Sequence, residues 1–94
     1  MKPHEHVILE VARERERQME KEGWTPEHDD QHSEGGLSRA AACYATSSKG
    51  GWPWSDADWK PKDRRRDLIR AAALIVAEIE RLDRQPAQQG KEQK

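Results

Sequence analysis

The chain has 94 residues, of which 37% are charged and 33% hydrophobic, and its formal net charge is −1. This length allows one domain with a modest core, and the near-zero charge excludes a global field that would draw the protein to nucleic acid or to a membrane. The longest apolar run, Ala71 to Ala77, is far too short for a membrane span, and the single cysteine excludes an internal disulfide. We therefore expect a cytoplasmic protein that gains stability as a homo-oligomer.

The first predicted helix runs from His4 to Glu22, and Gly23 fits the cap at its C-terminal end. Its apolar side recurs at helical spacing through Ile8, Val11, Ala12, Arg15 and Met19. Arg15 interrupts this side, and a buried arginine needs a carboxylate partner. The candidates are Asp29, Asp30 and Asp67, and a side chain that reaches out to solvent is the alternative.

A loop rich in acids and histidines is predicted from Trp24 to Gly36, and a second helix from Leu37 to Ala45. One side of the second helix carries small or apolar residues, namely Leu37, Ala40, Ala41 and Tyr44. The alanines suit close approach of another helix, and we expect them to contribute to the oligomer.

The third predicted helix runs from Asp63, which can cap its start, to Arg84, shortly before Pro86. Its apolar stripe consists of Leu68, Ile69, Ala72, Ile75, Val76, Ile79 and Leu82. The polar tail 85–94 is predicted to be disordered. The expected fold class is therefore all-α: a three-helix, bundle-like domain over residues 1–84, with a long tryptophan-rich loop between the second and third helices.

That loop, residues 46–62, holds three of the four tryptophans in a chain with one tyrosine and no phenylalanine. Connections of this length are uncommon in compact domains unless they are functional or disordered, and disordered segments are poor in aromatics. We therefore interpret the loop as an ordered surface with a function. Trp54 and Trp59 are expected to serve binding more than folding, although Trp52 and Trp54 could instead be lids over a small core.

Basic residues follow the tryptophans and open the third helix. Cations beside aromatic rings suit phosphate binding combined with base stacking, and a helix N-terminus also attracts anions. The alternative is a solvated turn whose cations balance the neighbouring aspartates. The candidate ligand-binding residues are Trp52, Trp54, Trp59, Lys60, Lys62, Arg64 and Arg65, and no catalytic residue is assigned.

The segment Glu27-His28-Asp29-Asp30-Gln31-His32 is the densest group of potential ligands for a metal ion. Glu27, Asp29 and Asp30 could bind Mg²⁺ through oxygen atoms. The alternative is that these acids form ion pairs with Arg13, Arg17 or Arg39 and cap the second helix. No cofactor other than this Mg²⁺ is considered.

Several stretches resemble a group of small uncharacterised phage and prophage proteins: Glu22-Gly23-Trp24-Thr25-Pro26-Glu27-His28-Asp29-Asp30-Gln31-His32, Trp52-Pro53-Trp54, Trp59-Lys60-Pro61-Lys62 and Ile79-Glu80-Arg81-Leu82-Asp83-Arg84. The resemblance implies a phage or prophage origin and no particular activity. A more distant resemblance is to the MazG-like all-α nucleoside triphosphate pyrophosphohydrolases. Members of that family hold magnesium with Glu-x-x-Glu and Glu-x-x-Asp motifs, and Glu-x-x-Glu does not occur here.

Three functional hypotheses follow. The first is a phage-type binding protein for a nucleotide-like or phosphate-bearing ligand, which sequesters a host defence signal. The second is a protein–protein module that inhibits a host factor, because tryptophan and arginine dominate interface hot spots. The third is a residual MazG-like, metal-dependent nucleotide pyrophosphohydrolase.

Overall fold

The computed structural model describes residues 1–85 and contains helices but no strand in that range. The elements are α1 (Pro3–Lys21), α2 (Pro26–Asp30), α3 (Gly36–Thr46), the 3₁₀ turn η1 (Asp56–Asp58) and α4 (Arg64–Asp83). The all-α fold class is thus confirmed. The predicted disorder of the tail concerns residues that lie, apart from Gln85, outside the described range.

The prediction of a continuous loop over residues 24–36 was wrong, because α2 forms within it. Thr25 caps this single turn, since its hydroxyl oxygen accepts a hydrogen bond from the backbone N–H of His28 (3.3 Å). Pro26 occupies the first helical position, where its missing N–H costs nothing. Local capping is therefore sufficient to build this turn between two longer helices.

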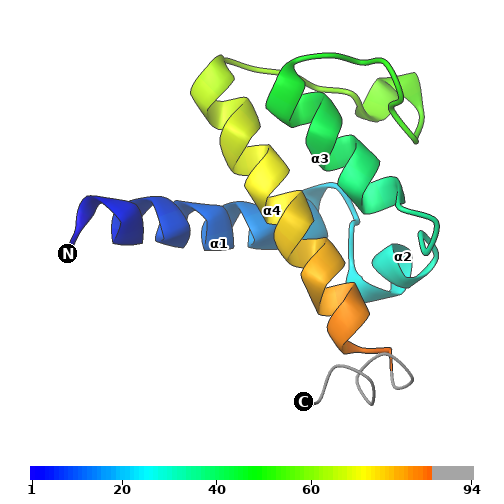
Figure 1. Ribbon diagram of the computed structural model, residues 1–94, viewed down its shortest axis with the longest axis horizontal. Helices are drawn as coiled ribbons and strands as arrows, with labels where there is room; N and C mark the ends of the chain where they lie inside the picture. Colours follow the sequence, from blue (N-terminus) through cyan, green and yellow to red (C-terminus); the bar gives the residue numbers. More distant parts are fainter. Residues whose placement is uncertain (86–94) are drawn as a thin grey trace.

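Helices α3 and α4 lie side by side, α2 lies near the lower end of the pair, and α1 crosses α4 (Figure 1). Only the C-terminal half of α1 packs against the rest of the chain, while its N-terminal half extends away from the other helices (Figure 1). Between residues 1 and 85, no helix is both long enough and apolar enough to cross a membrane.

The hydrophobic core lies mainly between α3 and α4. The predicted apolar side of α3 faces it, with Leu37, Ala40, Ala41 and Tyr44 all buried. Trp24 closes one end of this core. The alanines of α3 are consequently used inside the chain, so the expectation that they form a surface for oligomerisation was wrong.

The apolar stripe predicted for α4 is not the side that packs against α3. Leu68, Ile75 and Ile79 are 43%, 42% and 53% exposed, although such a stripe normally faces the core of its own chain. The buried side of α4 instead combines small or apolar residues with three charged ones: Asp67, Ile69, Arg70, Ala71, Ala73, Leu74, Ala77 and Arg81. Ile69 is the one residue of the predicted stripe that is buried. Alanines on both helices permit their close approach, which a stripe of bulky isoleucines would prevent.

The buried side of α1 is likewise polar and consists of Glu14, Arg15 and Gln18. Arg15 donates from one terminal nitrogen to Asp29 and Glu80, both at 2.9 Å, and from the other to the carbonyl oxygen of Trp24 at 2.9 Å. Asp29 is completely buried. Of the partners predicted for Arg15, Asp29 is therefore the one that the fold supplies.

Candidate ligand-binding site

The segment between α3 and α4 is an ordered structure that folds back over the C-terminal half of α3. Gly51 adopts a positive φ of 87°, which allows the chain to reverse. Ser55 caps η1, and its carbonyl oxygen accepts a hydrogen bond from the indole N–H of Trp52 (2.9 Å). The expected surface is therefore present, held by its own short-range hydrogen bonds.

The three tryptophans of this segment are all partly buried against the core. The ring of Trp52 lies edge-on to Tyr44 and to Trp54, with ring centroids 5.5 and 5.3 Å apart. Trp54 also meets Trp24 at 5.0 Å. Trp52 and Trp54 thus cover the core, as the lid alternative describes, and their truncation would remove packing as well as any binding surface.

Trp54 additionally contacts His28 of α2 and His32, two residues after that helix. Its indole N–H donates to the Nδ1 atom of His32 (3.3 Å), and its ring lies edge-on to His28 and His32. Burial, followed by the neighbouring His28, lowers the pKa of His32 below its usual range. Both effects favour the neutral imidazole, which is the form that can accept this hydrogen bond.

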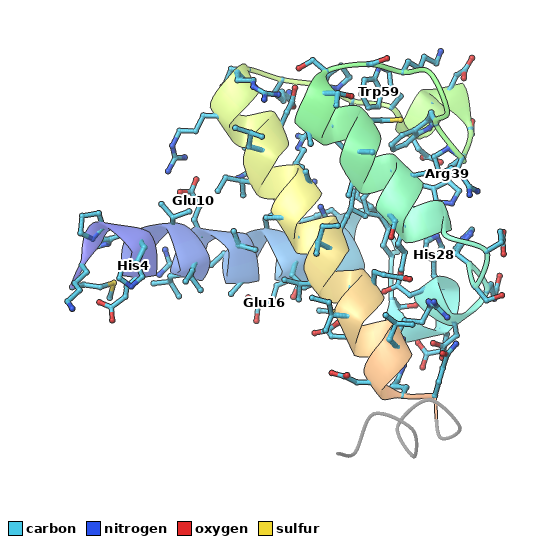
Figure 2. All side chains as sticks on the ribbon, in the orientation of Figure 1. His4, Glu10, Glu16, His28, Arg39 and Trp59 are labelled. Atoms are coloured by element: carbon cyan, nitrogen blue, oxygen red, sulfur yellow. The ribbon has the colours of Figure 1, made fainter. Side chains whose placement is uncertain are left out.

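Trp59 lies at the end of the segment, over the ring of Tyr44, at a centroid distance of 4.8 Å (Figure 2). Its indole N–H has no hydrogen-bond acceptor within residues 1–85, unlike those of Trp52 and Trp54. The next residue, Lys60, donates its backbone N–H to the Tyr44 hydroxyl oxygen (3.2 Å). Trp59 is therefore positioned by α3 but retains a free polar group.

The predicted cations differ in how far they are already neutralised. Lys60 forms an ion pair with Glu22 (3.1 Å), and Arg65 donates two hydrogen bonds to Glu10, each 2.8 Å long. Arg64 donates to the carbonyl oxygen of Ala45 at the end of α3. Among the residues that the structure describes, the side chains of Lys62 and Arg64 have no acidic partner.

The first turn of α4 is occupied by carboxylates of the chain itself. Asp63 accepts a hydrogen bond from the backbone N–H of Arg66 (2.8 Å), and Asp67 accepts one from the backbone N–H of Lys62 (2.7 Å). Two backbone N–H groups around this helix start, those of Lys62 and Arg66, are therefore already bonded to carboxylates. We call the residues Trp59, Lys60, Lys62, Arg64 and Arg65 the basic site.

Glu27, Asp29 and Asp30, the predicted metal ligands, do not converge. Asp29 binds Arg15 and also approaches His28 Nδ1 (3.0 Å), Asp30 binds Arg84 (2.7 Å), and Glu27 is exposed. Within residues 1–85 there is no group of three His, Cys, Asp or Glu side chains that could hold a metal ion. Asp29 and Asp30 are thus held in ion pairs, as the alternative predicts, but their partners are Arg15 and Arg84 rather than Arg13, Arg17 or Arg39. The predicted cap of the second helix was wrong, because Gly35 stands at the N-cap of α3.

Sequence reasoning missed three residues that shape the basic site. Glu10 in the middle of α1 neutralises Arg65, and Glu22, the residue directly after α1, neutralises Lys60. Arg70 places its guanidinium 5.7 Å from the centre of the Tyr44 ring. No local pattern identifies these three residues, because each is at least 26 positions from its partner in the sequence.

No family model, curated protein or solved structure matches the chain.

Proposed function

We propose that this protein is a small phage-type binding protein that takes a nucleotide-like or phosphate-bearing ligand at the basic site. The observation that supports this most is the pair of cations without acidic partners, Lys62 and Arg64, within five residues of Trp59. Ammonium and guanidinium groups bind phosphate through charge-assisted hydrogen bonds, and an aromatic side chain beside them offers a base a stacking surface or an N–H donor.

In this proposal the protein acts as a homo-oligomer in the cytoplasm of a bacterial host. The ligand is a host defence signal, which the protein sequesters rather than converts. Sequestration fits a site without converging carboxylates, because binding a phosphate group requires only cations and donors, whereas metal-assisted hydrolysis requires oxygen ligands for the metal ion.

The second candidate function is a protein–protein module that inhibits a host factor. The observation that favours it is the number of large apolar side chains left uncovered on α1 and α4. The third candidate, a residual MazG-like hydrolase that uses Glu27, Asp29 and Asp30, gains no support from the geometry, since Asp29 and Asp30 are bound to arginines.

The test is a calorimetric titration of the full chain with ATP, adenosine and inorganic pyrophosphate, which separates the contributions of base and phosphate. Lys62→Glu and Arg64→Glu should each weaken ATP binding about ten-fold or more, because each removes a charge-assisted contact. High salt should have a similar effect. Arg65 is unsuitable for this test, since reversing its charge would also break the contact with Glu10 on α1.

Lys49→Glu is the matched control, because Lys49 lies in the same segment but forms an ion pair with Asp56 away from α4. Trp59→Phe keeps a ring against Tyr44 while removing the indole N–H. The proposal is contradicted if none of the three compounds binds at millimolar concentration, or if Lys49→Glu weakens ATP binding as much as Lys62→Glu does.

A further inference from the structure

Helix α1 buries a polar side, and both α1 and α4 leave bulky apolar side chains uncovered. On α1 the polar residues Glu14, Arg15 and Gln18 are buried, while Ile8 and Leu9 are 62% and 39% exposed. On α4 the buried side is mainly apolar, and Leu68, Ile75 and Ile79 remain exposed on another side, as described above. We call the five residues Ile8, Leu9, Leu68, Ile75 and Ile79 the outer face.

One side of α1 is left uncovered near its N-terminal end but is covered by the rest of the chain near its C-terminal end. Ile8, Ala12 and Arg15 follow one another at helical spacing. Arg15 is covered by the Trp24 region and α4, but Ile8 and Ala12 lie on the half of α1 that extends away from the other helices (Figure 1). An open apolar groove runs along this half and is lined by Met1, Glu5, Ile8, Leu9 and Ala12.

One ion pair, between Arg65 and Glu10, links the uncovered stripes of the two helices. On α4, Arg65, Leu68, Ala72, Ile75 and Ile79 follow at intervals of three and four residues, so they share one side of the helix. Arg65 at the head of this stripe is held by Glu10, which projects from the extended half of α1 (Figure 2). The apolar residues of α4 therefore begin one turn beyond the link to α1.

The size of the outer face is close to what a stable association requires. From their exposed fractions, the side chains of the outer face together with Met1 present on the order of 600 Å² of apolar surface. A standard interface buries about 800 Å² per partner. The largest apolar patch of a typical monomer measures about 300–600 Å².

The charges around the face identify the partner. Arg13, Glu16 and Glu20 are exposed on α1 and form no ion pair within residues 1–85. They carry both signs, so two copies related by a two-fold axis can place an arginine of one opposite a glutamate of the other. An anionic membrane or nucleic acid would instead favour a rim of cations alone.

We infer that a second copy of this chain covers the outer face, so that the uncovered stripes of α1 and α4 from two chains form one shared apolar core. The monomer then uses the buried polar groups of α1 to fix the helix crossing and the uncovered apolar stripes of both helices to associate. This inference does not depend on the ligand proposed for the basic site.

Sedimentation equilibrium of the full chain tests the inference. The wild type should be a dimer at tens of micromolar, and Ile8→Glu and Ile75→Glu should each raise the dimer dissociation constant about thirty-fold or more, as expected for a charge placed in an interface hot spot. Ala42→Glu is the matched control: Ala42 is an exposed residue on α3, outside the outer face, and this variant should remain a dimer. Circular dichroism should show unchanged helix content in all variants, because each substituted side chain is exposed in the single chain.

Ile8→Ala and Ile75→Ala provide a second pair that preserves helix propensity, and both should weaken the dimer in the same direction. A wild type that remains monomeric overturns the inference, as does a dimer that withstands both glutamates. Binding of the monomeric wild type to anionic phospholipid vesicles, abolished by Ile8→Glu, would assign the face to a membrane surface and would also overturn it.

Discussion

The ion pairs of this protein contribute unequally to its stability, because some are buried and others are exposed to solvent. Arg15 and Asp29 form a buried pair, in which each needs the other because an isolated buried charge is costly. Asp30 and Arg84, by contrast, form a pair exposed to solvent, where ion pairs contribute little. Two adjacent aspartates therefore have unequal roles, although the sequence presents them as equivalent candidates for a metal site.

This difference predicts unequal effects of alanine substitution. Asp29→Ala should lower the free energy of unfolding by about 3 kcal/mol or more, because it leaves the buried Arg15 with the half-exposed Glu80 as its only acidic partner. Asp30→Ala, its matched control, should cost less than about 1 kcal/mol. Denaturant-induced unfolding followed by circular dichroism measures both values. Tight calorimetric binding of Mg²⁺ or Mn²⁺ that Asp29→Ala abolishes would contradict the structural role.

At the scale of elements, the helix bounds were predictable because capping and chain breaking are local. Asp63 caps the start of α4. After α1, Gly23 adopts a positive φ of 78°, and the backbone N–H of the next residue, Trp24, donates to the carbonyl oxygen of Gln18 (3.1 Å). The side that each helix buries was not predictable. Asp67 and Arg70 are buried only because they meet Lys62, Lys60 and Tyr44 in the folded chain, and hydropathy scales cannot anticipate such pairing.

The basic site, too, could be predicted from the sequence only in part. Its residues and its proximity to the tryptophans follow from their order in the sequence. Which cations stay unneutralised depends on Glu10 of α1 and on Glu22 directly after it, which the fold brings to Arg65 and Lys60. The burial of Trp52 and Trp54 similarly results from the return of the segment over α3.

The attachment of the tryptophan segment to α2 should depend on pH. The Trp54 indole needs a neutral His32 as its acceptor, and the pKa of His32 is lowered in the folded protein from its ordinary value of 6.5. The unfolded chain consequently binds this proton more readily, so the contribution of His32 to stability is present above pH 6.5 and is lost as the pH falls below that value.

Unfolding by denaturant at pH 7.5 and at pH 5.5 measures this effect. His32→Asn keeps an acceptor near the position of Nδ1 but does not titrate, so this variant should show a smaller loss of stability between the two conditions than the wild type. Equal losses in both proteins would mean that His32 does not control this attachment.

Over the described residues 1–85, the molecule has a small core of eleven buried hydrophobic residues, of which five are alanines. Its remaining bulky aliphatic side chains are largely on the outer face. The two proposals assign different roles to two surfaces that adjoin at Arg65: the outer face holds a second copy, and the basic site holds a phosphate-bearing ligand.

Native mass spectrometry of the protein purified from bacterial cells without denaturation tests both parts of this account in one spectrum. The account predicts a species with twice the mass of the chain that also carries a small molecule, which is released on unfolding and is lost in Lys62→Glu. A dimer that never carries a small molecule would contradict the proposed function alone. A species with the mass of a single chain at every concentration would contradict the shared core.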